Sequence, residues 1–277
     1  MDLDHLTATN EDIINWCRSY ELSSSAHSVD DRLVAEFSSN LVLRLNSHAL
    51  VKFGPSVTAS EAANQRLAHE SLNGRFLRVP QVYRFFQDTS LPENHWRGRC
   101  GYLVMEFIQG IKLSELPLED LPLHCHKIGR AIAEMSLLKS ERPGPADGGE
   151  PHGYIWAPDY RAYEIFKTVD DVAAWFNRAL VNEDTKIHFP SEQFPFCHLD
   201  LSRSNILYTQ DESYALLDWA DAGFYAMPIQ IWCLKKRTDD SCFVESLLEN
   251  LPELSVEEKA TLHLLDRAYY WNSLKGL

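Results

Sequence analysis

A polar turn between two apolar arms constrains the fold of this chain more than any other stretch. The arms, residues 205–209 and 214–218, are rich in apolar and aromatic side chains and flank the polar residues 210–213. This pattern predicts an antiparallel β-hairpin. Because the midpoint between Asn205 and Asp218 falls inside the turn, the hairpin would place these two side chains beside each other at its open end.

Two oxygen-bearing side chains at one end of a hairpin suit a hard cation. Mg²⁺ takes oxygen ligands, keeps several waters and uses few protein carboxylates, so we predict Asn205 and Asp218 as its ligands. Asp200 lies on the loop that enters the same hairpin and can face an acceptor hydroxyl. An ordinary hairpin with incidental acids is the alternative, but the combined spacing of the three polar residues favours a phosphoryl-transfer centre.

The order of these residues resembles a known catalytic arrangement. His198-x-Asp200-x-x-x-x-Asn205, followed by Asp218 after an apolar run, has the spacing of the protein-kinase catalytic loop and metal-binding aspartate. The neighbouring residues, Ile-Leu after Asn205 and Trp after Asp218, are more similar to the aminoglycoside phosphotransferase-like family of small-molecule kinases. The resemblance implies an α+β, bilobal protein-kinase-like fold, with a small antiparallel-sheet N-lobe and a larger, mainly helical C-lobe.

A lysine lies inside an apolar strand of the N-terminal third. Residues 37–45 and 49–53 are predicted strands, and Lys52 is near the end of the second. Such a lysine is costly to bury unless it meets an opposite charge. A helix that begins near Thr58 supplies Glu61. We therefore predict a Lys52–Glu61 ion pair, with an exposed lysine at a sheet edge as the alternative.

The surroundings of this lysine resemble the N-lobe of the same family, particularly of its fungal branch. There the lysine contacts the nucleotide α and β phosphates and a helix glutamate positions it, which implies these roles for Lys52 and Glu61. Backbone groups from Glu106 to Ile108 resemble the hinge that holds the purine edge. The resemblance thus implies Mg²⁺ with ATP or GTP as cofactors, an N-lobe over 1–108 and a C-lobe over 109–277.

The sequence departs from the family pattern in three respects. The first glycine of the chain is Gly54, so no glycine-rich loop precedes the lysine, and segment 38–40 or turn 46–48 would have to cover the phosphates. Leu199 stands where the family usually has glycine, and Ala220 where it commonly has an acid. The neighbouring Asp221 is a displaced candidate for that acid.

Periodicity and turn residues outline the remaining elements. Apolar side chains at helical spacing predict helices over 10–21, 123–138, 169–181, 228–251 and 256–274. A loop rich in proline and glycine, residues 142–158, carries Tyr154 and Trp156. We interpret these aromatic side chains as fastening the loop onto the core, with a cover over the acceptor as the alternative.

Composition limits the partners. The chain has 26 Lys and Arg against 40 Asp and Glu, a formal charge of −14, which argues against a nucleic-acid partner and would suit a cationic acceptor. Its six cysteines contain no C-x-x-C pair. No apolar run is long enough to span a membrane or form a signal sequence, so we expect a cytoplasmic monomer without a membrane partner.

The sequence therefore predicts a phosphotransferase that moves the γ-phosphate of a nucleoside triphosphate to a hydroxyl of a small molecule. In the mechanism that the resemblance implies, Asp200 takes the hydroxyl proton, and His198 braces the loop. Arg203 either braces the loop as well or touches the γ-phosphate. Two alternatives stay open, because folds host many functions: a kinase fold that catalyses non-phosphoryl chemistry, and a nucleotide-binding pseudoenzyme.

Overall fold

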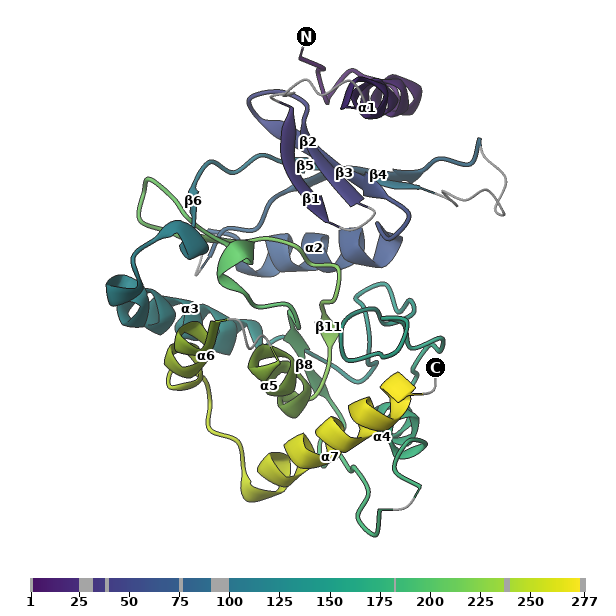
Figure 1. Ribbon diagram of the computed structural model, residues 1–277, viewed down its shortest axis with the longest axis vertical. Helices are drawn as coiled ribbons and strands as arrows, with labels where there is room; N and C mark the ends of the chain where they lie inside the picture. Colours follow the sequence, from purple (N-terminus) through teal and green to yellow (C-terminus); the bar gives the residue numbers. More distant parts are fainter. Residues whose placement is uncertain are drawn as a thin grey trace.

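The computed structural model has the two-lobed architecture of a protein-kinase-like fold (Figure 1). A twisted sheet with one helix on each side forms the N-lobe, and helices dominate the C-lobe below it. The structure describes residues 2–24, 32–37, 40–74, 77–90, 100–181, 183–236 and 240–274.

The N-lobe sheet has five antiparallel strands in the order β1-β2-β3-β5-β4. Strand β3 lies at its centre and is buried at every position, which makes it a rigid support for Lys52. The elements of this lobe are α1 (Asn10–Ser24), β1 (Leu33–Phe37), β2 (Asn40–Arg44), β3 (Ala49–Gly54), α2 (Ala59–Leu72), β4 (Val82–Gln87) and β5 (Gly101–Glu106).

The predicted single strand over 37–45 was wrong. Phe37 pairs with Asn40, so the chain reverses between them and residues 33–37 form a strand of their own. The periodicity missed this turn because apolar residues continue on both sides of it. Two segments were candidates to cover the nucleotide phosphates. Segment 38–40 lies mostly outside the described residues. Turn 46–48 contacts the N-terminal segment, because Asn46 Nδ2 donates to Leu3 O at 2.7 Å.

The first helix covers the outer face of this sheet, as Figure 1 shows. The helix predicted over 10–21 is present as α1, and Ile13, Cys17 and Tyr20 are its buried face. They pack with Leu43 and Val51 of the sheet in one hydrophobic cluster. The N-lobe core therefore depends on a helix that precedes the sheet in the sequence.

The C-lobe combines helices with short strands of two to four residues. Its helices are α3 (Leu121–Met135), α4 (Val169–Asn177), α5 (Met227–Lys235), α6 (Ser241–Leu248) and α7 (Val256–Ser273), with 3₁₀ turns at Leu113–Glu115, Leu118–Asp120 and Arg203–Asn205. Its strands are β6 (Ile111–Lys112), β7 (Lys139–Ser140), β8 (Phe194–Cys197), β9 (Ile206–Tyr208), β10 (Tyr214–Leu216) and β11 (Gly223–Phe224).

One long helix predicted over 228–251 is two helices, α5 and α6. Asp240 interrupts it because its carboxylate accepts from Phe243 N at 3.2 Å and so caps a new helix. The other predicted C-lobe helices are present, with α4 ending at Asn177 rather than at residue 181.

Trp156 lies in the centre of a C-lobe core. It is fully buried and packs against Phe176 and Tyr225 at centroid distances of 5.3 and 5.7 Å. The interpretation that this side chain fastens the loop 142–158 is confirmed, whereas Tyr154 is 38% exposed. Among the described residues no helix has both the length and the apolar character needed to cross a membrane.

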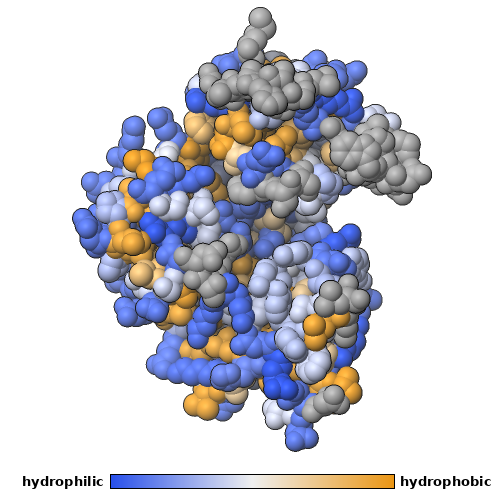
Figure 2. All heavy atoms as spheres, viewed as in Figure 1, coloured by the Kyte–Doolittle hydropathy of each residue, from blue (hydrophilic) through white to orange (hydrophobic). Residues whose placement is uncertain are grey.

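Surface side chains differ between the lobes. On the face seen in Figure 2, hydrophilic residues cover most of the C-lobe, and apolar residues gather in the N-lobe around β1. Leu33 and Val34 of this strand are 39% and 41% exposed. Val34 also lines the pocket between the lobes, so part of this apolar surface faces a cavity rather than the core.

Candidate active site

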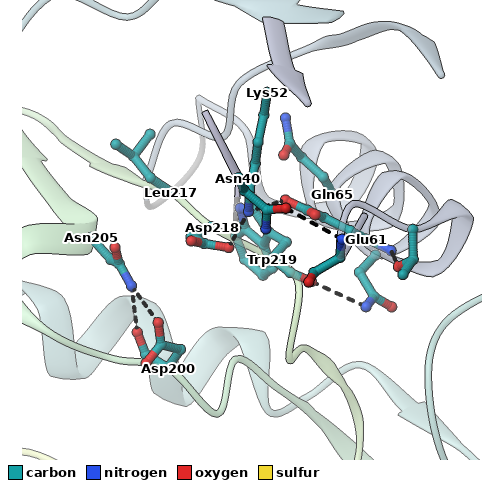
Figure 3. Close-up of polar contacts among 12 residues, drawn as sticks. Asn40, Lys52, Glu61, Gln65, Asp200, Asn205, Leu217, Asp218 and Trp219 are labelled. Atoms are coloured by element: carbon teal, nitrogen blue, oxygen red, sulfur yellow. Dashed lines mark hydrogen bonds and ion pairs between the residues drawn. The ribbon is translucent and has the colours of Figure 1, made fainter. Parts of the chain in front are cut away.

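Lys52 joins the two lobes through two ion pairs. Its Nζ lies 2.7 Å from Glu61 Oε1 on α2 and 2.8 Å from Asp218 Oδ1 after β10 (Figure 3). The predicted pair with Glu61 is therefore present, while the contact with Asp218 was not predicted. Thr58 caps α2 by accepting from Glu61 N at 3.1 Å, which fixes the glutamate at the start of the helix facing β3.

The charges of this cluster depend on one another. Burial alone would lower the pKa of Lys52, but the carboxylates of Glu61 and Asp218 outweigh it and raise that pKa. Burial raises the pKa of Glu61 despite the lysine. For Asp218 the attraction to Lys52 overcomes burial and holds the pKa of the carboxyl below its usual value. Lys52 is thus a cation and Asp218 an anion at neutral pH.

Asp200 and Asn205, which were predicted to lie on one loop, are in direct contact in the structure. Asn205 Nδ2 donates to Asp200 Oδ2 at 2.7 Å and to Asp200 O at 3.0 Å, as Figure 3 shows. Because the amide nitrogen donates, the carbonyl oxygen Oδ1 of Asn205 is the atom that can ligate a cation.

The hairpin register differs by one residue from the prediction. Asn205 O accepts from Leu217 N at 2.8 Å, so Asn205 lies opposite Leu217 rather than Asp218. The reason is the turn: Thr209 pairs with Ser213 around a three-residue loop whose last residue, Glu212, has φ +59°. Asp218 follows the pairing with φ +61° and points toward Lys52 in Figure 3.

Leu199 adopts the conformation that glycine would favour. Its φ is +59°, in the left-handed region that costs a side-chain-bearing residue about 1–2 kcal/mol. Gln230 on α5 supports this backbone, since its Oε1 accepts from His198 N at 2.8 Å and from Leu199 N at 3.2 Å. Sequence reasoning missed Gln230, although a polar residue inside the apolar run MPIQIWCLK was a usable signal.

The imidazole of His198 braces the loop, as expected. Its Nε2 lies 3.0 Å from Leu217 O, and its Nδ1 accepts from Asp200 N at 3.2 Å. This pattern requires a proton on Nε2 and ties both sides of the hairpin entrance together.

Arg203 is also a bracing residue. Its guanidinium donates to Leu113 O at 2.8 and 3.0 Å and to Leu116 O at 2.9 Å, and it pairs with Asp240 at 3.3 Å. With its side chain 9% exposed, it is engaged by these groups. The structure thus favours the bracing role over contact with the γ-phosphate.

Helix α2 also holds the segment after Asp218. Asn64 Nδ2 donates to Trp219 O at 3.2 Å and to Ala222 O at 2.6 Å, while its Oδ1 accepts from Ala146 N at 2.8 Å. Asn64 lies one turn after Glu61, so the same helix positions the lysine's partner and the backbone beyond Asp218. Sequence reasoning did not single out Asn64.

A pocket of about 250 Å³ between the lobes contains most of the predicted site. Apolar side chains of Val42 and Leu50 lie on the N-lobe side, and Leu207 and Leu217 on the C-lobe side. The predicted residues that line it are Lys52, Glu61, Glu106, Ile108, Asn205 and Asp218.

Residues 106–108 line one side of this pocket. Some of their hydrogen-bonding groups are already paired, and others are available to a ligand. Glu106 N donates to Gln81 O at 2.9 Å, and its side chain pairs with Arg78 at 2.9 Å. Within the described part of the chain, the Ile108 N–H has no hydrogen-bond partner. Its backbone is therefore available to a ligand edge, while the Glu106 carboxylate is engaged.

Asn205 and Asp218 could hold a cation that brings other ligands with it. No group of three His, Cys, Asp or Glu side chains among the described residues could hold a metal by itself. One amide oxygen and one anionic carboxylate, both facing the same pocket, fit Mg²⁺, which completes its shell with waters and phosphate oxygens.

A second pocket, which we call the acceptor pocket, adjoins the first. It has a volume of about 420 Å³, and Ser204 lines both pockets. Leu199 and Ser202, on either side of Asp200 in the sequence, also line it. Asp200 itself is not among the described residues that line either pocket, but Ser204, which lines both, follows it by four residues in the same loop.

Asp221, the displaced candidate acid, lies beneath the loop at Gly153. A Cβ added to Gly153 would be 2.8 Å from its Cγ, so a glycine is required for this close approach. Burial, with repulsion from Asp218, raises the pKa of Asp221 to about 7. Near neutrality it carries a partial charge, unlike Asp218.

Together, the five-stranded lobe with its Lys52–Glu61 pair, the loop carrying Asp200 and Asn205, and Asp218 after the hairpin define a protein-kinase-like fold. A sequence model described as the Phosphotransferase enzyme family matches residues 32–233, which is more than half of the chain. The protein belongs to this family. Assignment to its fungal branch stays a prediction.

Solved structures of aminoglycoside phosphotransferases have a similar fold. A thermostable variant of aminoglycoside phosphotransferase APH(4)-Ia matches with a TM-score of 0.56 and 16% identity over 93% of this chain and 92% of that one. A variant of aminoglycoside 2′-phosphotransferase-IIIa in complex with GDP matches with a TM-score of 0.54 and 11% identity over 95% and 88%.

Another thermostable variant of APH(4)-Ia, in a ternary complex with AMP-PNP and hygromycin B, matches with a TM-score of 0.53 and 17% identity over 91% and 88%. At these identities the likeness concerns the fold. Among curated protein sequences, none matches this chain.

Proposed function

We propose that this protein transfers the γ-phosphate of ATP or GTP, with Mg²⁺, to a hydroxyl of a small molecule. The observation that carries the proposal is that two pockets meet at Ser204, on the loop that also carries Asp200. One pocket holds Lys52, Asn205 and Asp218, which suit a nucleotide and its cation, and the other is open to an acceptor.

In the proposed reaction Asp200 orients the acceptor hydroxyl. The hydroxyl oxygen forms a new bond to the γ-phosphorus, the bond from that phosphorus to the β–γ bridging oxygen breaks, and the hydroxyl proton passes to the Asp200 carboxylate. Asn205 supports this role because its amide holds one carboxylate oxygen at 2.7 Å. His198 and Gln230 keep the loop backbone in place from the other side.

Lys52 positions the donor. A cation held by a glutamate at 2.7 Å presents a fixed charge to the α and β phosphates, and fixed charges contribute to phosphoryl transfer through alignment and electrostatic stabilisation. Mg²⁺, held by Asn205 Oδ1 and Asp218, would neutralise charge on the phosphate oxygens. The apolar residues Val42, Leu50 and Leu207 suit the faces of a purine, with the backbone of Ile108 at its edge.

The choice between ATP and GTP stays open in this proposal. The aminoglycoside phosphotransferase structures described above contain nucleotides of both kinds, AMP-PNP in one complex and GDP in another. A backbone hinge at Ile108 would hold either purine by its edge. The lobe boundary after Ile108, the monomeric state and the cytoplasmic location likewise remain predictions.

Thermal unfolding with nucleotide tests the binding half of the proposal. A ligand that binds the native state at 100 times its Kd stabilises it by about 2.7 kcal/mol. We expect Mg²⁺ with ATP or GTP to raise the Tm, and Asp218→Ala to lose this metal-dependent shift. Absence of any shift at millimolar nucleotide would refute nucleotide binding and with it the phosphotransferase proposal.

The Asp200→Asn variant tests the chemical half. It retains the shape of the side chain but not the proton acceptor, so we expect nucleotide binding to persist and phosphorylated products from a metabolite extract to disappear. Asp184→Asn, at an exposed position, is the matched control and should retain activity. Nucleotide binding by the parent without any product would favour the pseudoenzyme alternative, and unchanged activity of Asp200→Asn would favour other chemistry.

A further inference from the structure

The acceptor pocket carries little negative charge despite the acidity of the whole chain. Its charged lining residues, among those that the structure describes, are Arg203, Lys236 and Asp240. Asp240 is engaged twice, by Arg203 at 3.3 Å and by Phe243 N at 3.2 Å. An ammonium group that entered this pocket would lose hydration without gaining a free carboxylate from these residues.

Acids elsewhere in the C-lobe do not change this balance. Glu245 and Glu249 are exposed and do not line the pocket. Asp221, with its pKa raised to about 7 by burial and by Asp218, is only partly ionised at neutral pH. The formal charge of −14 therefore lies mostly outside the acceptor pocket.

Aromatic side chains from three elements form one wall beside the pocket. Tyr154 lines the pocket and is stacked on Tyr269 of α7 at 5.1 Å and 26° and on Trp232 of α5 at 6.0 Å and 29°. Tyr160 adds a fourth ring 6.1 Å from Tyr154. We call these four residues the aromatic wall.

One edge of the wall is open to a ligand. Tyr154 and Tyr160 are 38% and 58% exposed, which is unusual for rings whose only role is to fill a core.

The wall is not a free cage for a cationic ligand. Aromatic faces attract cations, but Lys236 Nζ already lies 5.2 Å from the centroid of Trp232. Lys236 also lines the pocket and is ion-paired with Asp266 at 2.5 Å, so the carboxylate nearest to this ring already has a cation. A neutral planar ring, in contrast, could stack on Tyr154 without displacing Lys236 from Trp232 or from Asp266.

We propose that the acceptor is a hydroxylated aromatic molecule without a net positive charge, which stacks against Tyr154. The remaining apolar lining, Leu199, Cys233 and Phe243, offers further contact to a planar ring. This assignment rests on the proposed function for its reaction, since the hydroxyl would be the group that Asp200 faces. It differs from a polycationic amino sugar, for which the described lining supplies no free carboxylate.

Binding without nucleotide separates this proposal from the phosphotransferase proposal. Calorimetric titration of the full chain with 1,5-dihydroxynaphthalene probes the aromatic class, and titration with kanamycin and with choline probes cations. We expect the naphthalene diol to bind and the two cations to bind at least tenfold more weakly. Tighter binding of either cation would overturn the proposal.

Variants locate the binding at the wall. We expect Tyr154→Leu to weaken binding of the diol at least tenfold, Tyr154→Phe to retain it, and the more exposed Tyr160→Leu to weaken it about threefold. Tyr163→Leu, at an exposed tyrosine outside the wall, is the control and should bind like the parent. Unchanged affinity in both leucine variants of the wall would overturn the assignment.

The nucleotide-dependent Tm shift is measured on the same variants. It depends on the pocket between the lobes, so we expect Tyr154→Leu to keep it, which also shows that the variant is folded. If the diol binds as expected but no nucleotide shift is seen in the parent, the phosphotransferase proposal fails and the aromatic site stands. If the shift is seen but the diol does not bind, the reverse holds.

Discussion

Gln230 supports the catalytic loop through two buried hydrogen bonds, and its loss should be measurable. In Gln230→Leu the amides of His198 and Leu199 lose their acceptor, at about 1–3 kcal/mol for each buried N–H. The same change removes Gln230 Nε2, which is buried without a hydrogen-bond partner among the described residues, and so recovers about 1–3 kcal/mol. Since leucine has a similar volume, we expect a net loss of roughly 1–3 kcal/mol.

Urea unfolding at pH 7 measures this loss as a lower midpoint with an unchanged slope. Gln193→Leu, at an exposed position, is the matched control and should unfold like the parent. The support of the loop that carries Asp200 also predicts a fall in turnover of tenfold or more, because small displacements of reacting groups are costly. A Gln230→Leu protein within about 0.5 kcal/mol of the parent would refute the reasoning.

Three further changes have defined outcomes. Lys52→Met leaves Glu61 buried without its cation and should lower the unfolding free energy by about 3–5 kcal/mol, with recovery in the double variant that adds Glu61→Gln. Asp221 has a pKa of about 7 when folded against a reference value of 3.8, so the native state binds the extra proton and stability falls as pH rises from 4 to 7. Asp221→Asn should lack this fall in cation-free buffer and be more stable than the parent at pH 8, as thermal unfolding across pH would show. Leu199→Gly relieves about 1–2 kcal/mol of backbone strain but loses a buried side chain that is worth about 2–5 kcal/mol, so urea unfolding should show a net destabilisation.

The sequence predicted those parts of the site that are close together along the chain. Lys52 and Glu61 are joined by one strand end and one helix start, and Asp200 and Asn205 by one loop, so spacing alone places each pair. The contact between Lys52 and Asp218 connects residues on different lobes. Local patterns carry no information on how the lobes close, and this contact was therefore missed.

Turns account for most of the errors in the fold. A single strand was predicted where β1 and β2 form a hairpin, and one helix where Asp240 starts a second. The hairpin register was displaced by one residue because the loop has three residues, with Glu212 in a left-handed conformation, which no pattern of apolar residues specifies. Gln230 and Asn64 were missed because their role is to form hydrogen bonds with backbone groups that are distant in the sequence.

The family match covers less of the chain than the cores do. It spans residues 32–233, whereas Ile13 of α1 and Leu265 of α7 are fully buried in the N-lobe and C-lobe clusters. A chain cut to the matched range would expose the apolar partners of both helices, among them Leu43 and Tyr225. The segment that matches the family is thus shorter than the segment that completes the two hydrophobic cores.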